Sequence, residues 1–185
     1  MASEYNQDII CDNYLNAKTN GFFVDIGGSF HEQWNNSFFF EKMRNYRGLA
    51  IDLNPEYTQG WIENRPNTKF IVGDATTQDY QKHLDELNAP NTIDFLSIDI
   101  DPRHQSLAAL YKIFTTSYNF STIAFEVDAG HGGEGWIDVR DNSREFLKSR
   151  DYVLVAEIYK GGYHVDDIWV HKLIHDPFVI TNDNN

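Results

Sequence analysis

The segment GFFVDIGG, residues 21–28, decides the fold class of this chain. It is a short apolar run that ends in an acidic residue and a glycine pair. Similar runs follow at residues 48–52, 69–74, 93–99 and 122–128. Continuous apolar runs of this length are typical of strands buried on both faces of a parallel sheet. We therefore expect these segments to form the parallel part of one sheet.

Segments of helical length separate the runs. We expect helices at residues 34–45, 55–64, 78–87 and 104–116, and a short helix that follows residues 140–143 and ends at residue 149. Strands that alternate with helices predict a doubly wound sheet with right-handed crossovers. Two further strands, Tyr152–Tyr159 and Tyr163–His171, flank a glycine pair that is too short for a crossover, so they form an antiparallel hairpin. The predicted fold is α/β and Rossmann-like, with about seven strands that are mostly parallel before this C-terminal hairpin.

Composition narrows the functional classes. The chain has 185 residues, 28 acidic and 15 basic side chains, and a formal net charge of −13. We expect one domain over residues 1–185, with an N-terminal segment at 1–20 and a frayed tail at 181–185. Nucleic-acid and anionic-membrane partners are not expected, because phosphate binding needs a basic surface. The lone Cys11 excludes an intramolecular disulfide, and no signal peptide or membrane span is visible, so a cytoplasmic location is expected.

Acidic residues end three successive runs of the predicted sheet. Asp25 precedes Gly27 and Gly28, Asp52 follows 27 residues after Asp25, and Asp74 ends the third run. In open α/β sheets the carboxyl ends of the strands bind ligands. The glycines let a ligand approach the backbone, Asp52 is placed to accept both hydroxyls of a ribose, and Asp74 is placed to accept from an adenine amino group. The pattern indicates an adenosine-type ligand. Two alternatives stay open: Asp25 as a cap of the next helix, and Asp74 as a turn residue without a ligand.

The glycine turn favours one such ligand. Residues 27–32 read GGSFHE, without the third glycine of a dinucleotide fingerprint and with acidic residues nearby. This turn suits a pyrophosphate poorly and suits the cationic amino-acid end of S-adenosylmethionine. The antiparallel hairpin at the C-terminal end of the chain also favours S-adenosylmethionine as the ligand.

Several motifs together resemble the FkbM family of S-adenosylmethionine-dependent methyltransferases. They lie at residues 21–25, 36–42, 48–57, 94–101 and 125–128, and the stretch DFLSIDID at 94–101 is the most specific. The resemblance spans residues 20–175, with an Asp at position 52 where Glu is commoner and no further glycine after Gly28. It implies a class I methyltransferase fold and O-methylation, most often of a sugar hydroxyl. The predicted cofactor-binding residues are Asp25, Gly27, Gly28, Asn36, Asp52, Leu53, Asp74, Ala75 and Asp99.

The ends of the fourth and fifth runs carry the groups expected to react. Methyl transfer to a hydroxyl needs orientation of the acceptor and removal of its proton, by a base or with the help of a divalent cation. The predicted catalytic residues are Asp99, His104 and His131. Clustered carboxylates favour a hard ion such as Mg²⁺, and its predicted ligands are Asp99, Asp101, Glu126 and Asp128. If this ion is required, chelation suppresses methyl transfer and leaves cofactor binding intact.

Two other functions stay open from the sequence. Asp99-Ile100-Asp101 matches the Asp-x-Asp pattern of metal-dependent glycosyltransferases, and the weakened glycine turn is compatible with a non-catalytic Rossmann-like binding module. The acceptor is expected to be a small molecule or a glycan, and a homodimer stays open. Residues 1–20, 129–140 and 160–164 are expected to shape the acceptor pocket. Trp136 is a candidate for stacking on a sugar, whereas Trp169 and residues 38–40 are expected in the core.

Overall fold

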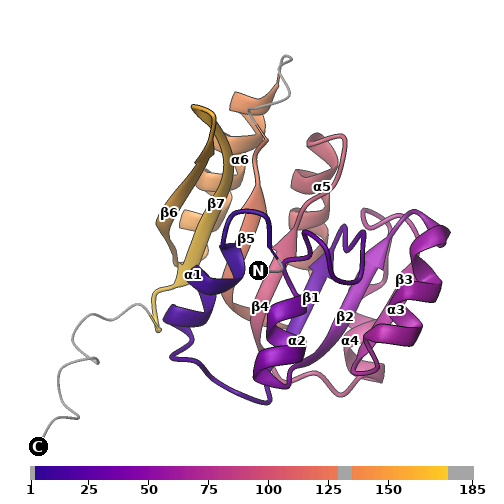
Figure 1. The fold of residues 1–185 in the computed structure, drawn as a ribbon. Helices are drawn as coiled ribbons and strands as arrows, with labels where there is room; N and C mark the ends of the chain where they lie inside the picture. Colours follow the sequence, from indigo (N-terminus) through magenta and orange to yellow (C-terminus); the bar gives the residue numbers. More distant parts are fainter. Residues whose placement is uncertain (1–2, 129–134, 175–185) are drawn as a thin grey trace, which may run out of the picture.

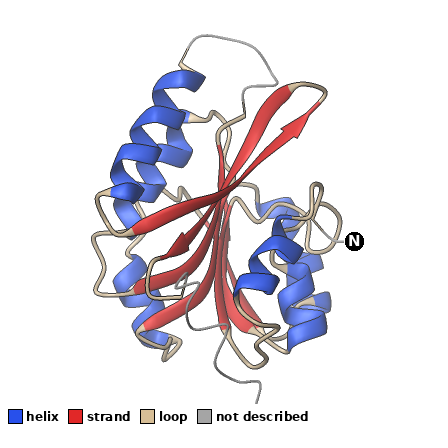
Figure 2. Cartoon of the chain, turned by 90° about the vertical axis from the view of Figure 1, so that its left-hand side faces the viewer, coloured by secondary structure: helices blue, strands red, loops and turns tan. Residues whose placement is uncertain are grey.

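The computed structural model describes residues 3–128 and 135–174 and shows one seven-stranded sheet with helices on both faces (Figures 1 and 2). The strands are β1 (Phe22–Ile26), β2 (Arg47–Asp52), β3 (Thr68–Val72), β4 (Thr92–Ile98), β5 (Asn119–Glu126), β6 (Tyr152–Lys160) and β7 (Tyr163–His171). Their order is β3-β2-β1-β4-β5-β7-β6, and β7 is antiparallel to both of its neighbours while the remaining pairs are parallel. The predicted fold class, including the C-terminal antiparallel hairpin, is confirmed. The expected frayed tail at 181–185 lies outside the described residues.

The helices occupy the predicted places with shifted ends. They are α1 (Gln7–Tyr14), α2 (Phe38–Arg44), the 3₁₀ helix η1 (Pro55–Tyr57), α3 (Thr58–Asn64), α4 (Tyr80–Glu86), α5 (His104–Ile113) and α6 (Trp136–Lys148). Asn54 caps η1 as predicted, because its side chain accepts a hydrogen bond from the Glu56 N–H at 3.0 Å. The helix expected from residue 34 begins only at Phe38, since residues 34–37 belong to a loop that the site uses.

The last helix is longer than the sequence indicated. Residues 140–143, expected to precede a short helix, lie inside α6. Val139, Ser143 and Leu147 are its buried side chains, spaced four residues apart, so the polar residues between them occupy the solvent face. The prediction was wrong here because an exposed helical face resembles a turn in composition.

Each face of the sheet has its own apolar core. On one face Val24, Leu96 and Ile123 pack with buried side chains of α4, α5 and α6. On the other face Phe23 and Phe95 pack with α1 and with Phe40 of α2. Trp169 is fully buried as expected, whereas only Phe40 of residues 38–40 is fully buried. Because successive side chains along each strand point to opposite faces, each strand contributes to both apolar cores. The two cores together hold the sheet in place beneath the site.

The strand register brings functional positions to one edge. β1 lies between β2 and β4, so the chain reverses its direction of winding between β1 and β4, where α/β sheets bind ligands. Ile26 pairs with Ile98, Ile98 pairs with Phe125, and Glu126 pairs with Asp166 across the antiparallel β5–β7 ladder. Carboxylates that are far apart in the sequence therefore meet at the carboxyl ends of β4 and β5 and in β7. In the part of the chain that is described, no helix is long and apolar enough to span a membrane.

Candidate active site

A cavity of about 1110 Å³ opens at the carboxyl ends of the parallel strands. Its walls come from the ends of β1 to β5, from the segment before α1 and from the turn between β6 and β7. Seven of the nine predicted cofactor residues line it, namely Gly27, Asn36, Asp52, Leu53, Asp74, Ala75 and Asp99. Asp25 and Gly28 are buried beside the cavity and do not line it. Seven of the predicted residues thus lie in the cavity wall and two lie beside it, and the cofactor role of all nine stays a prediction.

Asp52 is held in a fixed orientation at the end of β2. The Ser29 N–H donates to Asp52 Oδ2 and the Asn54 N–H donates to Asp52 Oδ1, both at 2.8 Å. Each carboxylate oxygen has a second acceptor position, so the group can also accept two hydroxyl hydrogen bonds. Leu53, which follows it, is 72% exposed in the wall of the same cavity. A carboxylate beside an exposed apolar side chain suits a ribose with an attached base.

Asp74 combines a turn role with a place in the cavity wall. The backbone N–H and the hydroxyl of Thr76 donate to Asp74 Oδ1 at 2.8 and 2.7 Å. These hydrogen bonds lower the pKa of Asp74, so the group is a charged acceptor at neutral pH. The turn interpretation of Asp74 is therefore confirmed through one of its oxygens, and its contact with an adenine amino group stays a prediction.

Gly27 has a direct steric reason to be glycine. Its φ is +86°, and a Cβ at this position would lie 1.7 Å from the Asp99 carbonyl oxygen. β1 and β4 therefore meet closely at their ends, and any side chain at Gly27 would push them apart. This close approach sets Asp99 directly beside the glycine turn.

Asp25 supports the loop between β1 and α2 from below. The hydroxyl of Ser37 and the amide of Asn35 donate to Asp25 Oδ2 at 2.6 and 2.9 Å. The same Asn35 amide donates to the Gly28 carbonyl at 2.8 Å. Burial raises the pKa of Asp25, and these donors offset part of that rise. Asp25 thus holds the glycine turn and the Asn36 region in place without facing the cavity.

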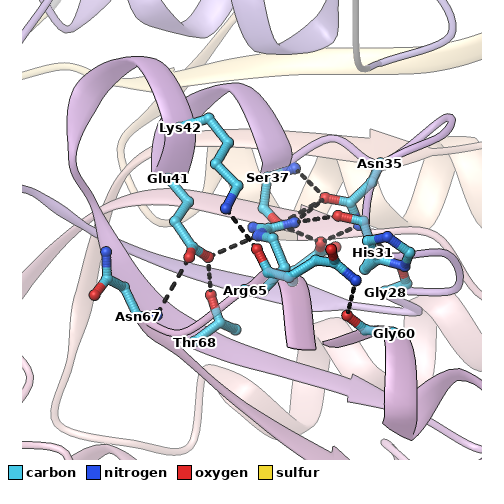
Figure 3. A network of polar contacts seen from close by, with 12 residues as sticks. Gly28, His31, Asn35, Ser37, Glu41, Lys42, Gly60, Arg65, Asn67 and Thr68 are labelled. Carbon is cyan, nitrogen blue, oxygen red and sulfur yellow. Dashed lines mark hydrogen bonds and ion pairs between the residues drawn. The ribbon is translucent and has the colours of Figure 1, made fainter. Parts of the chain in front are cut away.

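Arg65, which the sequence analysis did not single out, joins this loop to α2 and α3. Its side chain is fully buried; it donates to Glu41 Oε2 at 2.6 Å, to the His31 carbonyl at 2.8 Å and to Ser37 Oγ at 3.0 Å (Figure 3). The guanidinium also lies 4.5 Å from the Trp61 ring centroid. A buried charge is tolerated only when it is paired and bonded in this way. The only signal in the sequence was an arginine at a helix end, which is too common to be informative.

Three carboxyl groups gather where β4, β5 and β7 meet. Asp99, Glu126 and Asp166 all line the cavity. Burial, followed by the Asp99 charge and a hydrogen bond with Asp99, raises the pKa of Glu126 far above its usual range. Among the described residues, no N–H or O–H group donates a hydrogen bond to Glu126 Oε2. We therefore expect Asp99 and Glu126 to share a proton. Burial and the Asp99 charge likewise raise the pKa of Asp166 to about 8.

The other predicted reactive residues differ in position. Asp101 and Asp128 line the cavity, but Arg103 lies 3.4 Å from Asp128 Oδ2. His104 is the exposed first residue of α5 and is not among the described residues that line the cavity. His131 lies outside the described residues. Trp136 is half-buried beneath Arg140 and does not line the cavity formed by the described residues.

The predicted Mg²⁺ ligands do not form a close donor set. Among the described residues, the group that brings three ligand atoms within 4.8 Å of one another is Glu157, His164 and Asp167. Asp99, Asp101, Glu126 and Asp128 do not meet this distance as a group, so as arranged they do not fit one small cation that needs several oxygens at short distance. The group at Glu157 already has a cationic partner, because Arg144 donates to Glu157 and to both oxygens of Asp167.

The cavity wall also contains residues that no motif predicted. Glu4, Tyr5 and Gln7 come from the N-terminal segment, and Lys160 and Tyr163 come from the β6–β7 turn. Both segments were expected to shape the pocket, but not through particular side chains. Of the expected 129–140 loop, residues 129–134 lie outside the described part. The missed side chains are polar residues in irregular segments, and only the tertiary fold brings them to the cavity.

The chain was compared with known protein families, with curated sequences and with solved structures. No model of a known protein family matches the chain, and no curated protein matches its sequence. Solved structures do match. A TehB-like SAM-dependent methyltransferase from Corynebacterium glutamicum is 15% identical with a TM-score of 0.53, over 91% of this chain and 89% of that one. The chain has the class I methyltransferase fold.

Two further matches are structures with a bound S-adenosyl compound. Fibrillarin from Aeropyrum pernix, with natively bound S-adenosyl-L-methionine, is 13% identical with a TM-score of 0.55, over 83% of this chain and 67% of that one. The 1,6-didemethyltoxoflavin-N1-methyltransferase of Burkholderia thailandensis, with bound S-adenosylhomocysteine, is 14% identical with a TM-score of 0.51, over 89% and 76%. At these identities the likeness concerns the fold, and the resemblance to the FkbM family stays a prediction.

Proposed function

We propose that this chain is an S-adenosylmethionine-dependent O-methyltransferase that acts on a hydroxyl of a sugar or glycan. The observation that carries the proposal is Asp52. Its two carboxylate oxygens are each fixed by a backbone N–H, in the wall of the same cavity as Gly27 and Asp99. This arrangement at the carboxyl ends of β1 and β2 suits the ribose of an adenosine-type ligand. Structural neighbours with bound S-adenosylmethionine or S-adenosylhomocysteine support the choice of ligand.

The proposed cofactor site follows the cavity wall. Asp52 and Leu53 would hold the ribose and one face of the base, Asp74 and Ala75 the adenine edge, and Gly27 with Asn36 the amino-acid end. The cofactor would supply the methyl group. Asn36 is buried, and its amide donates to Ser97 Oγ at 3.0 Å, so its carbonyl oxygen keeps a fixed direction for an ammonium group.

Asp99 is the proposed catalytic residue. Burial raises the pKa of Asp99 as well as that of Glu126, while the hydrogen bond with Glu126 favours the charged form of Asp99, which lies beside the glycine turn. A charged Asp99 can accept the hydrogen bond of an acceptor hydroxyl and take its proton as the new C–O bond forms. Of the other two predicted bases, His104 lies away from the cavity wall, and His131 is proposed on sequence grounds alone. No step is routed through Mg²⁺, since its predicted ligands do not fit that ion as arranged.

The fold does not select the acceptor. The neighbours include a fibrillarin/Nop5p complex and a 1,6-didemethyltoxoflavin-N1-methyltransferase. A sugar is favoured by the FkbM resemblance and by the aromatic side chains of the cavity wall, in which Trp34 and Tyr163 expose 60% and 56% of their surface. The net charge of −13 disfavours nucleic acid.

Two experiments test the proposal. Calorimetry with S-adenosylmethionine, S-adenosylhomocysteine and a nucleotide sugar tests the ligand; nucleotide-sugar binding without S-adenosylhomocysteine binding would establish the glycosyltransferase alternative instead. Incubation with methyl-labelled S-adenosylmethionine and a panel of sugars, glycans, amines and RNA then tests the acceptor. Label in a sugar hydroxyl supports the proposal, and cofactor binding without transfer to any acceptor would favour a binding module.

A further inference from the structure

The strand order arranges the polar residues of the cavity in a row along one edge of the sheet. Figure 1 shows β2, β1, β4, β5 and β7 side by side in this order. Asp52 ends β2, Gly27 follows β1, Asp99 follows β4, Glu126 ends β5, and Asp166 lies in the first half of β7. Because the proposed cofactor residues belong to β1 and β2, an acceptor beyond Asp99 lies over β5 and β7. β4 and β7 are two strand spacings apart, about 10 Å, so side chains of both strands can contact one ligand of the size of a sugar ring.

The Asp166 side chain is held in one orientation by Gln7. The Tyr5 N–H can only donate, and it bonds Gln7 Oε1 at 2.9 Å. The amide nitrogen of Gln7 therefore faces Asp166 and donates to its Oδ2 at 2.9 Å. Gln7 and Asp166 are each 4% exposed, and both line the cavity. Among residues 3–128 and 135–174 no other group bonds the Asp166 carboxyl group, so its Oδ1 is left for a ligand.

Asp166 is mostly a neutral carboxylic acid at pH 7. Burial, followed by the Asp99 charge, raises its pKa to about 8, and the further charges that act on it, those of Asp167 and Glu4, are also negative. Lys160, the basic side chain in the described part of the cavity wall, already bonds Glu4 Oε1 at 2.7 Å. Since Oδ2 accepts the amide hydrogen bond, the proton of the neutral group lies on Oδ1. The free position of Asp166 is therefore a hydrogen-bond donor.

We propose that Asp166 determines acceptor specificity by donating a hydrogen bond from Oδ1 to a second oxygen of the acceptor, whose reacting hydroxyl lies at Asp99. The acceptor class is then a polyhydroxylated ring and not a compound with a single hydroxyl. A neutral donor suits such a ligand, because uncharged hydroxyls cannot compensate a buried carboxylate. The contact with the acceptor rests on the proposed function, whereas the orientation and protonation of Asp166 do not.

Carboxyl-carbon NMR of the full chain tests the donor without any ligand. At pH 6 the Asp166 carboxyl carbon should have the chemical shift of a protonated group. The carboxyl carbon of Asp151, an exposed aspartate bonded to Lys172 at 2.7 Å, should have the shift of an ionised group. The spectra of Asp166→Asn and Asp151→Asn assign the two signals. An ionised Asp166 at pH 6 would overturn the proposal.

Calorimetry with methyl glycosides tests the contact with the acceptor. The probes are methyl α-glucopyranoside, methyl α-galactopyranoside, methyl α-mannopyranoside and their monodeoxy derivatives, added to protein saturated with S-adenosylhomocysteine. Asp166→Ala should weaken glycoside binding about three- to tenfold, the usual effect of losing one hydrogen bond. Asp166→Asn should retain most of the affinity, since an Asn side chain can accept from Gln7 and donate to the ligand. Asp141→Ala, which removes an exposed carboxylate of α6, is the control.

The monodeoxy derivatives identify the contacted oxygen. One of them should bind the native chain and Asp166→Ala equally weakly, because it lacks the oxygen to which Asp166 donates. Four results would each overturn the proposal: equal weakening of every derivative by Asp166→Ala, native affinity in that variant, a loss in Asp166→Asn as large as in Asp166→Ala, and no binding of any glycoside. S-adenosylhomocysteine binding, measured first, shows that each variant is folded. If the native chain does not bind it, the proposed function fails; in that case, or if Asp166→Ala does not fold, the NMR result still decides whether Asp166 is a neutral donor.

Discussion

Glu126 of β5 and Asp166 of β7 stand opposite each other in the antiparallel ladder, and both line the cavity beside Asp99. Like charges directly opposite in a sheet are destabilising, and burial makes their ionisation more costly still. The pair is therefore a place where the fold accepts an electrostatic cost inside the candidate active site. Such costs are typical of groups that handle protons or bind a ligand.

The first prediction concerns stability against pH. The pKa of Asp166 is raised from 3.8 to about 8, so the folded state holds a proton more tightly than the unfolded state does. The contribution of Asp166 is most favourable below its unfolded pKa near 4 and is lost as the pH rises towards 8. Asp166→Asn should remove this loss, so its stability relative to the native chain should increase across that window, by at most about 1.4 kcal/mol per pH unit.

Urea denaturation at several pH values between 4 and 8 provides the measurement. Asp151→Asn is a control of opposite sign, since Lys172 lowers the pKa of the exposed Asp151 and its small contribution is lost as the pH falls. A difference between Asp166→Asn and the native chain that stays constant across the window would contradict the prediction.

The second prediction concerns Asp52. Asp52→Ala removes the carboxylate that is expected to accept the ribose hydroxyls, and S-adenosylhomocysteine binding should weaken by about 1–3 kcal/mol, as expected when polar groups lose their partner. Asp52→Glu should retain part of the affinity. Asp141→Ala, an exposed carboxylate on α6, is the control and should bind like the native chain. Calorimetry measures all of these, and native affinity in Asp52→Ala would rule out its role as the ribose ligand.

The fold and the cavity were predictable for different reasons. The apolar runs that end in Asp25, Asp52 and Asp99 carry their own period and end signals, so the strands, their mostly parallel arrangement and the expected ligand edge follow from local pattern and topology rules. What local pattern cannot show is which way a strand-end side chain points. Asp25, on β1, turns under its own loop towards Ser37, whereas Asp52, on the neighbouring strand, faces the cavity.

Long-range contacts explain why other residues of the site could not be predicted from the sequence. Gln7 reaches Asp166 across 159 positions of sequence, and Arg65 reaches Glu41 and Ser37 from another helix. Neither residue belongs to a motif, and each is informative only when the tertiary structure places its partner beside it. His131 and the glycine-rich loop around it lie outside the described residues, so their predicted role stays a prediction.

The third prediction concerns the network beneath the loop. Arg65→Met would leave Glu41 buried and without its cation, and a broken buried ion pair costs about 3–5 kcal/mol in the free energy of unfolding. Arg140→Met removes a partly exposed arginine with a neighbouring aspartate and should cost less than about 1 kcal/mol. Urea denaturation measures both.

The same network should also affect the cofactor site. Asp25→Asn keeps the shape of the side chain but changes what Ser37 and Asn35 can donate to, so the Asn36 region should lose its fixed position. We expect weaker S-adenosylhomocysteine binding in Asp25→Asn although Asp25 does not line the cavity. Native affinity together with native stability in this variant would contradict a supporting role for Asp25.

The fourth prediction concerns metal removal. From sequence alone, four carboxylates at two strand ends favoured Mg²⁺, and chelation was then expected to stop methyl transfer. In the structure Asp99 is set against Glu126, Arg103 lies beside Asp128, and the four predicted ligands do not gather around one point. The carboxyl pair can instead lower its repulsion by sharing a proton. Once an acceptor is known, methyl transfer should therefore persist in excess EDTA, whereas Asp99→Asn should lower kcat by about 100-fold or more, the usual effect of losing a general base. Binding of S-adenosylhomocysteine, measured in the same samples, separates loss of chemistry from loss of the cofactor. Suppression of turnover by EDTA that added Mg²⁺ restores would show that the carboxylates rearrange around a metal when substrate binds, and would return Asp101 and Asp128 to the catalytic site.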